Sequence, residues 1–251
     1  MIFTLQPFSV RSVSSALEMG FPVFGRYYRS MKENEFRLFI GGLPAVPGIL
    51  DRELYFNSAV LVPFLFIGGE YHLLFQKRAA DIRQGSEICF PGGRHDGNLD
   101  RDFQETAVRE TVEELGIARE KITITGRLDT LITPRGMIVE TFIGTLALDS
   151  LDELRPAPGE VEKVFTIPVS WFIQNSPEIY FVRVELQPST TGLDGKKQIL
   201  LPVDELGLPA IYGENWEGMR NRVIVYKTEK YLIWGMTAAI VFNMIQKITN
   251  G

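Results

Sequence analysis

The sequence predicts an α+β protein in which helices cover a mixed β-sheet. Several short apolar runs end at glycine or proline, which is typical of buried strands. Two longer segments, one central and one near the C-terminus, have the periodicity and the stop signals of helices. Strands and helices are mixed along the chain, so the sheet and its covering helices belong to one fold.

The strand predictions start with residues 59–66, a buried apolar run that ends at Gly68-Gly69. Residues 71–76 return as a second strand, so the two are expected to form a hairpin. A short strand over 87–90 stops at Pro91-Gly92-Gly93. Further strands are predicted over residues 121–128, 138–146, 161–169, 180–186 and 222–226.

The central helix is predicted over residues 102–115, with Asp100 as its N-cap and Gly116 as its C-terminal stop. A helical turn is expected at 170–173, and a C-terminal helix over about 235–248. Residues 231–245 form the longest apolar stretch, but Gly235 and Asn243 interrupt it. Its length favours a buried core helix over a membrane span.

The domain prediction divides the chain at residue 55. Residues 1–55 are irregular and rich in glycine and proline, and we expect an N-terminal extension packed on the main domain. Residues 56–251 form that main domain and include the C-terminal helix. Residues 1–20 lack the charge and apolar pattern of a signal peptide, so a cytoplasmic protein is expected, with no membrane partner.

Composition restricts the chemistry. The net charge of −5 and the lack of a basic stripe argue against a nucleic-acid partner. The chain has one cysteine and two histidines, which excludes an internal disulfide and disfavours zinc sites built from those residues. Any metal ligands should therefore be carboxylates, which suit Mg²⁺ or Mn²⁺.

The central helix separates apolar from acidic residues at 100° per residue. Its apolar stripe consists of Val108, Val112 and Leu115. Its acidic residues are Glu110, Glu113 and Glu114. Like charges at this spacing repel, and a bound divalent cation reverses the sign of that interaction. Such a cation would also neutralise phosphate oxygens and position an attacking water.

A simpler explanation is that the three glutamates form an ordinary solvated face. The combination with Pro91-Gly92-Gly93 argues against it, because glycines there let the backbone pass close to the helix and its ligands. Fixed residues at many positions between Pro91 and Ile117 seldom coincide by chance.

This combination resembles the box of the Nudix hydrolase family. Gly93 opens it, and residues 109–117 (Arg-Glu-Thr-Val-Glu-Glu-Leu-Gly-Ile) match its second half, with Thr111 in an apolar slot. The resemblance implies the Nudix fold, an α/β/α sandwich around a mixed sheet, over residues 56–251. It also implies that Glu110, Glu113 and Glu114 bind the metal and that Arg109 orients a glutamate by a salt bridge.

The spacing departs from the family pattern. The interval from Gly93 to Arg109 is two residues longer than usual, so the insertion must loop out before the helix. The usual acidic position, eight residues before the arginine, is Arg101 here. Asp100 and Glu105 are the alternatives for that role.

Segments outside the box resemble coenzyme A pyrophosphatases of the family. They include residues 73–79 and Arg83, followed by Phe90-Pro91-Gly92-Gly93. The implied reaction cleaves coenzyme A or acyl-CoA into 3′,5′-ADP and a 4′-phosphopantetheine product. The expected substrate-binding residues are Lys77, Arg78, Arg83, Gly92, Gly93 and His95. Alternatives are ADP-ribose or another nucleoside-diphosphate substrate, and a Nudix-fold binding or regulatory protein without turnover.

The general base is not fixed by the sequence. Glu140 lies on a predicted strand after the box and is the first candidate, with a plain strand residue as the competing reading. Glu160 and Glu162 are further candidates. The partner is expected to be a small nucleoside-diphosphate molecule, and a homodimer is a candidate assembly.

Overall fold

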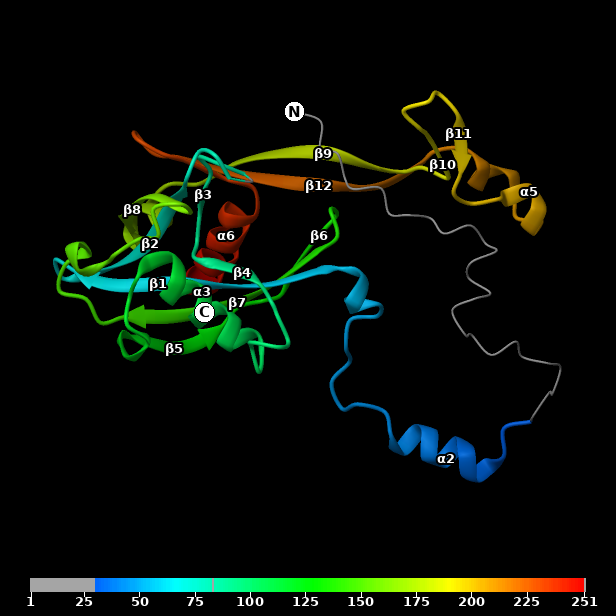
Figure 1. Ribbon diagram of the computed structural model, residues 1–251, viewed down its shortest axis with the longest axis horizontal. Helices are drawn as coiled ribbons and strands as arrows, with labels where there is room; N and C mark the ends of the chain where they lie inside the picture. The colour runs from blue at the N-terminus through cyan, green and yellow to red at the C-terminus, as the bar shows by residue number, and fades with distance from the viewer. Residues whose placement is uncertain (1–29, 83, 251) are drawn as a thin grey trace. The chain divides into compact units, whose positions relative to one another are not determined.

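The computed structural model describes residues 30–82 and 84–250 (Figure 1). The chain divides into two units, Met1–Leu50 and Asp51–Gly251. The described part of the first unit contains helix α2 (Glu33–Gly41), in which no residue is buried. The sequence analysis predicted irregular chain there. The glycine- and proline-rich segments around this single short helix obscured its helical pattern. Packing of residues 1–55 on the main domain remains a prediction.

The second unit contains the elements of the main domain. Its first half consists of η1 (Arg52–Leu54), β1 (Phe56–Ile67), β2 (Glu70–Arg78), β3 (Ile88–Cys89), β4 (Gly92–Arg94), α3 (Phe103–Leu115), η2 (Arg119–Lys121), β5 (Ile122–Arg127), β6 (Leu131–Thr133) and β7 (Met137–Leu146). Its second half consists of η3 (Leu151–Glu153), β8 (Val161–Pro168), α4 (Val169–Gln174), β9 (Glu178–Leu186), β10 (Ser189–Thr191), β11 (Lys197–Ile199), α5 (Val203–Leu206), η4 (Ala210–Gly213), β12 (Trp216–Lys227), β13 (Leu232–Trp234) and α6 (Gly235–Asn250).

The main sheet is mixed, as predicted. Its strand order is β3-β2-β1-β7-β5, with β4 on β1, β6 on β7 and β8 on β2. Strands β1 and β7 run parallel, and the other pairs are antiparallel. The predicted hairpin forms between β1 and β2, with Gly68 and Gly69 at positive φ in the turn.

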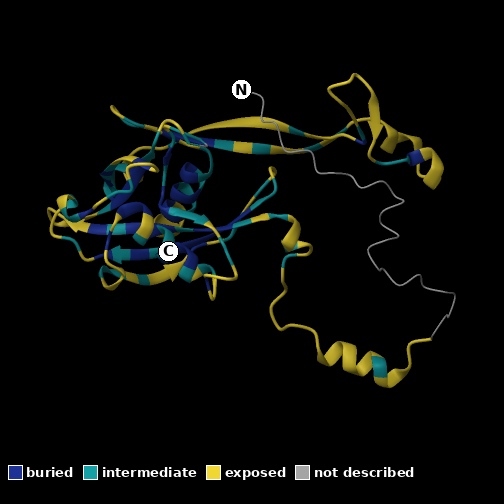
Figure 2. Ribbon diagram, viewed as in Figure 1, coloured by how far each residue is buried: buried dark blue, intermediate teal, exposed yellow. Residues whose placement is uncertain are grey.

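Each face of the sheet packs against its own set of helices. Successive β1 residues point to opposite faces, so Leu61 joins the core beneath α3 while Val62 joins the core beneath α4 and α6. Leu74 and Leu73 divide between the two cores in the same way. Figure 2 shows buried residues concentrated in this layered region. The predicted α/β/α sandwich around a mixed sheet is therefore confirmed.

Some elements escaped the sequence analysis. Strand β6 and residues 187–215, which hold β10, β11, α5 and η4, were not predicted. The predicted strands over 180–186 and 222–226 pair with each other as β9 and β12, in a separate sheet with order β13-β12-β9. In the described parts of the chain, no helix combines the length and apolar character needed to cross a membrane.

Candidate active site

Helix α3 carries the acidic segment and has well-defined ends. Its N-cap is Asp102, whose carboxylate accepts a 2.9 Å hydrogen bond from the Glu105 backbone N–H. The prediction of Asp100 as N-cap is wrong, because the capping residue lies two positions later in the chain. Gly116 ends the helix in the left-handed conformation, as predicted. A Cβ there would lie 2.0 Å from the Arg155 carbonyl oxygen, so this position requires glycine.

Asp100 instead anchors the arginine of the box. Its buried carboxylate accepts hydrogen bonds from Arg109 Nε at 2.7 Å and Arg109 Nη2 at 2.9 Å, a bidentate pair. Thr106 Oγ1 donates a further bond to it at 2.9 Å. The hydrogen bonds from Arg109 hold the pKa of Asp100 well below its usual range, despite burial. Of the two alternatives for the acidic position, Asp100 occupies it, while Glu105 accepts a bond from the Arg101 backbone N–H.

Arg109 links this anchor to two glutamates of the box. Its Nη1 donates to Glu110 Oε1 at 2.8 Å and to Glu113 Oε2 at 3.1 Å. Its Nη2 also donates to the Arg94 carbonyl oxygen at 3.3 Å. The guanidinium is therefore held on one side by Asp100 and orients Glu110 and Glu113 with the other.

The three glutamates differ in burial, which argues against the simpler explanation of an ordinary solvated face. Side-chain exposure falls from 57% at Glu113 to 17% at Glu110 and 5% at Glu114. The Glu114 carboxylate accepts hydrogen bonds from Gln76 Nε2 at 2.8 Å and from the Gly92 backbone N–H at 2.9 Å. Burial raises the pKa of Glu114 to about 7, although both bonds favour its charged form.

Gly92 and Gly93 both allow a close approach between the backbone and the glutamates. A Cβ on Gly93 would lie 2.4 Å from Cδ of Glu110. A Cβ on Gly92 would lie 2.4 Å from the Ala59 carbonyl oxygen of β1. Only glycine therefore lets β4 pair with β1 while its backbone contacts Glu110 and Glu114. This is the close passage that the sequence predicted.

The residues present fit a hard divalent cation. Burial raises the pKa of Glu110 as well, and the nearby charges of Glu113 and Glu160 add to that effect. Carboxylate oxygens gathered at a partly buried site are the ligands that Mg²⁺ and Mn²⁺ prefer. Among the described residues, no three acidic, histidine or cysteine side chains already converge as a preformed ligand set. Arg109 occupies the space between Glu110 and Glu113.

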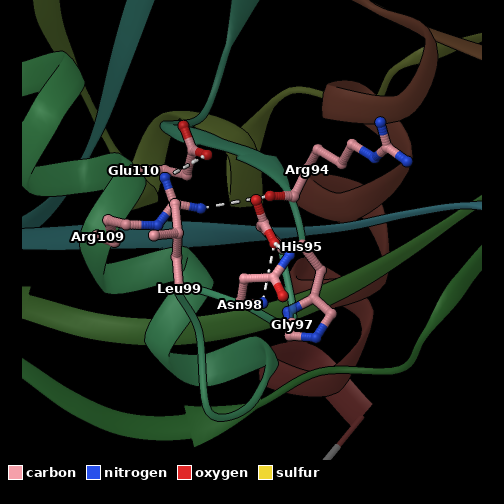
Figure 3. A pocket seen from close by; sticks show the side chains of 8 residues that line it. Arg94, His95, Gly97, Asn98, Leu99, Arg109 and Glu110 are labelled. Carbon is pink, nitrogen blue, oxygen red and sulfur yellow. Dashed lines mark hydrogen bonds and ion pairs between the residues drawn. The ribbon is translucent and has the colours of Figure 1, made fainter.

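A cavity of about 520 Å³ opens beside this cluster (Figure 3). It is lined by Arg94, His95, Asp96, Gly97, Asn98, Leu99, Arg109 and Glu110. Predicted substrate residue His95 lies there, with Nδ1 2.8 Å from Thr106 Oγ1 and its ring 4.3 Å from that of Phe103. The loop lengthened by the two-residue insertion thus forms one wall of the cavity.

The basic residues predicted to bind substrate lie at different distances from the acidic cluster. Arg78 Nη1 lies 3.9 Å from Glu114 Oε1, at the buried end of the acidic cluster. Lys77 forms an ion pair with Glu162, with 2.6 Å between Nζ and Oε1. Arg83 lies outside the described residues. Of the two basic residues that the structure describes, Arg78 lies at the box and Lys77 does not.

Glu140, the first candidate for the general base, is buried in a structural cluster. Its carboxylate forms ion pairs with Arg52 and Arg127 and accepts a 2.8 Å hydrogen bond from Thr130. Burial alone raises the pKa of Glu140, but these bonds outweigh it and the net pKa is lowered. These contacts favour the competing reading of a strand residue with a structural role. Arg52, which the predicted boundary assigned to the extension, belongs to the second unit together with Glu140.

One residue of the site escaped the sequence analysis. Gln76 is fully buried in β2, where its amide donates to Glu114 and its Oε1 has no hydrogen-bond partner. A polar residue closing the apolar run Leu73-Leu74-Phe75 was the available signal, because a buried amide needs a partner.

Comparison with known families decides the assignment. The model of the NUDIX domain matches residues 56–184, which include β1, β4 and the whole of α3. The chain belongs to the Nudix family. The resemblance inferred from the box is therefore confirmed, together with the fold that it implied.

Several curated relatives carry substrate names. The chain is 33% identical to the mouse peroxisomal coenzyme A diphosphatase NUDT7 over 49% of this chain and 50% of that protein. It is 35% identical to the human mitochondrial coenzyme A diphosphatase NUDT8 over 49% of this chain and 53% of that protein. The match thus spans about half the length of these relatives.

A longer match carries no substrate name. The uncharacterized Nudix hydrolase NudL of Photorhabdus laumondii is 28% identical over 76% of this chain and 84% of that protein. A solved MutT/nudix family protein from Enterococcus faecalis is 13% identical with a TM-score of 0.44, covering 88% of this chain and 71% of that one. The assignment rests on the family match.

Proposed function

We propose that this protein hydrolyses the diphosphate linkage of a nucleoside-diphosphate derivative with the help of Mg²⁺ or Mn²⁺. The observation that carries the proposal is the intact set of contacts around the box. Asp100 fixes Arg109, Arg109 orients Glu110 and Glu113, and Gln76 and Gly92 fix Glu114. A protein without turnover has no need to hold three repelling carboxylates in place.

Glu110, Glu113 and Glu114 would hold the cation with their carboxylate oxygens. When bound, the cation polarises the phosphorus–oxygen bonds and activates a water for attack at phosphorus. Asp100 and Arg109 act through the glutamates, because their bonds restrict the carboxylate orientations. Arg78 lies where it can offset phosphate charge beside Glu114.

Coenzyme A or an acyl-CoA is the substrate that we favour. The support is the substrate named for the two relatives at 33% and 35% identity, together with the motif before the box. The cavity lined by His95 and Arg109 offers room and polar groups beside the reacting centre. ADP-ribose, or another nucleoside-diphosphate compound, is the alternative substrate for the same chemistry.

A substrate panel tests both levels of the proposal. The panel consists of coenzyme A, dephospho-coenzyme A, ADP-ribose, NADH and diadenosine polyphosphates. Turnover of each compound would be measured in the presence of Mg²⁺, in the presence of Mn²⁺ and after treatment with EDTA. We expect the highest kcat/KM for coenzyme A, a lower value without its 3′-phosphate, and no turnover with EDTA. Far better turnover of ADP-ribose would overturn the substrate and leave the reaction intact.

Full activity in verified metal-free protein would overturn the metal-dependent reaction itself. Tight binding of a panel compound without any turnover would favour a binding or regulatory protein. A cytoplasmic location and the absence of nucleic-acid and membrane partners remain predictions, as do the site roles of the individual residues.

A further inference from the structure

The ribbon formed by β9 and β12 exposes apolar side chains on both of its faces. Alternate residues of β9 point to opposite faces, and Phe181 on one face and Val182 on the other are 62% and 51% exposed. Figure 2 shows β9 exposed along most of its length. A two-stranded ribbon is marginally stable by itself, and contiguous exposed apolar surface marks an interaction site.

The segment that joins the two strands also buries few of its residues. In residues 187–215, Pro188 and Val203 are the buried residues, while Leu193 is fully exposed. Large apolar side chains between Ile179 and Met219, among them Leu186, Leu200 and Ile211, are 47% to 71% exposed. Apolar surface therefore continues from the ribbon into this segment.

Among the described residues, no strand pairs with the outer edge of β9. In the sheet order β13-β12-β9, strand β9 is terminal and has β12 on one side. Its unpaired backbone N–H and C=O groups can add another strand. A second copy of the same strand is a suitable occupant if its side chains match in charge and shape.

The charges of β9 select one symmetric register. In a two-fold antiparallel pair, residues opposite each other lie on the same face of the sheet, so an odd-numbered residue meets an odd-numbered residue. The charged residues of β9 are Glu178, Arg183 and Glu185. Arg183 can therefore meet an opposite charge only at Glu185, which requires that Val184 lie at the two-fold axis.

We propose that the protein forms a homodimer in which β9 pairs antiparallel with β9 of a second copy, centred on Val184. Arg183 then faces the partner's Glu185, and this pair occurs twice because the axis relates the two copies. Arg183 lies 2.8 Å from Glu185 and 3.1 Å from Glu217 within its own chain, so the partner carboxylates complete an alternating charge network. Val182 faces the partner's Leu186, which joins the apolar surfaces of the two copies.

Complementary charge reversal tests the register. Sedimentation equilibrium of the full chain would be measured for wild type, Arg183→Glu, Glu185→Arg and a one-to-one mixture of the two variants. We expect a wild-type dimer, and a dissociation constant weakened about tenfold or more in each variant alone, because like charges then face each other. The mixture should recover the dimer, because every 183–185 pair across the axis is again opposite in charge.

The mixture is the decisive measurement. Repulsion within each chain is the same whether the variants are separate or mixed, so recovery of the dimer reports only the contacts between chains. A mixture that stays as dissociated as its components, beside a dimeric wild type, would overturn this pairing. A monomeric wild type at micromolar concentration would overturn the dimer and leave the apolar ribbon to be covered by another part of this chain.

A cross-linking experiment gives an independent readout. Val184→Cys places two cysteines opposite each other at the axis, and mild oxidation should give a disulfide-linked dimer on a non-reducing gel. Leu193→Cys, fully exposed and away from β9, is the matched control and should link far less. Equal linking of both variants would contradict the proposed interface. Unchanged turnover of the panel substrates and an unchanged melting temperature would show that each variant folds.

Discussion

Asp100 holds Arg109 with both carboxylate oxygens, at 2.7 and 2.9 Å, from a position nine residues earlier in the chain. The usual position for this acidic residue is occupied by Arg101, which is exposed. The longer loop before α3 brings Asp100 to the arginine from outside the helix. The longer loop therefore still places a carboxylate against Arg109.

The first prediction concerns this pair. Asp100→Asn should lower kcat by roughly 10- to 100-fold, because Arg109 no longer holds Glu110 and Glu113 in place. It should also lower the free energy of unfolding by about 3 kcal/mol, because the partly buried Arg109 loses its bidentate carboxylate partner. Steady-state kinetics and chemical denaturation measure the two effects. Arg101→Gln, an exposed control, should leave both quantities near wild type.

The second prediction is the pH dependence of stability that Asp100 produces. Its folded-state pKa lies below its unfolded value, so its contribution is complete above about pH 5 and is lost as pH falls through the acid range. Wild type should therefore lose more stability between about pH 5 and pH 2 than Asp100→Asn does. Denaturation midpoints across that range measure the difference. Parallel profiles for the two proteins would show that Asp100 is not held in its charged form.

The third prediction separates Glu113 and Glu114 by burial. Changing either to glutamine should lower kcat by roughly 10²- to 10³-fold if both bind the cation. In metal-free protein at pH 8, Glu114→Gln should raise the melting temperature, because it removes a buried carboxylate whose pKa is about 7. Glu113→Gln should leave that temperature nearly unchanged, because its side chain is exposed. Near-normal kcat in both variants would show that neither glutamate takes part in the reaction.

The fourth prediction concerns Gly93. Alanine there would place a methyl group 2.4 Å from Cδ of Glu110, and the flexible glutamate must move away. We expect a lower kcat and weaker activation by Mg²⁺, with a melting temperature close to wild type. Gly126→Ala is the matched control, since no atom lies within 4 Å of a Cβ at that position. If kcat and metal activation are normal in Gly93→Ala, the close approach has no role in catalysis.

The fifth prediction decides between a base and a structural carboxylate at Glu140. Its contacts with Arg52 and Arg127 predict that Glu140→Gln lowers the melting temperature, and that Arg127→Met lowers it in a similar way. A general base would show the opposite pattern, with kcat lost in Glu140→Gln, stability kept and Arg127→Met still active. Measuring kcat and melting temperature for both variants distinguishes the two roles.

The sequence by itself determined the family, the mixed sheet between helices and the identity of the box glutamates. Each depends on local pattern: alternation gives the strands, and the spacing of Arg109, Glu110, Glu113 and Glu114 gives the acidic helix. The glycine stop at Gly116 was also predictable, because a left-handed residue at a helix end favours glycine.

The tertiary structure decided which side chains meet across the sheet and how deeply each is buried. Helical periodicity placed Glu114 with Glu113 on one face, but the packing of β2 and β4 against α3 buries Glu114 beneath Gln76 and Gly92. The role of Glu140 likewise depends on Arg52, from a segment 88 residues earlier in the chain. Such contacts join residues far apart in the sequence, so no local pattern encodes them, and burial then sets the charge that each carboxylate can carry.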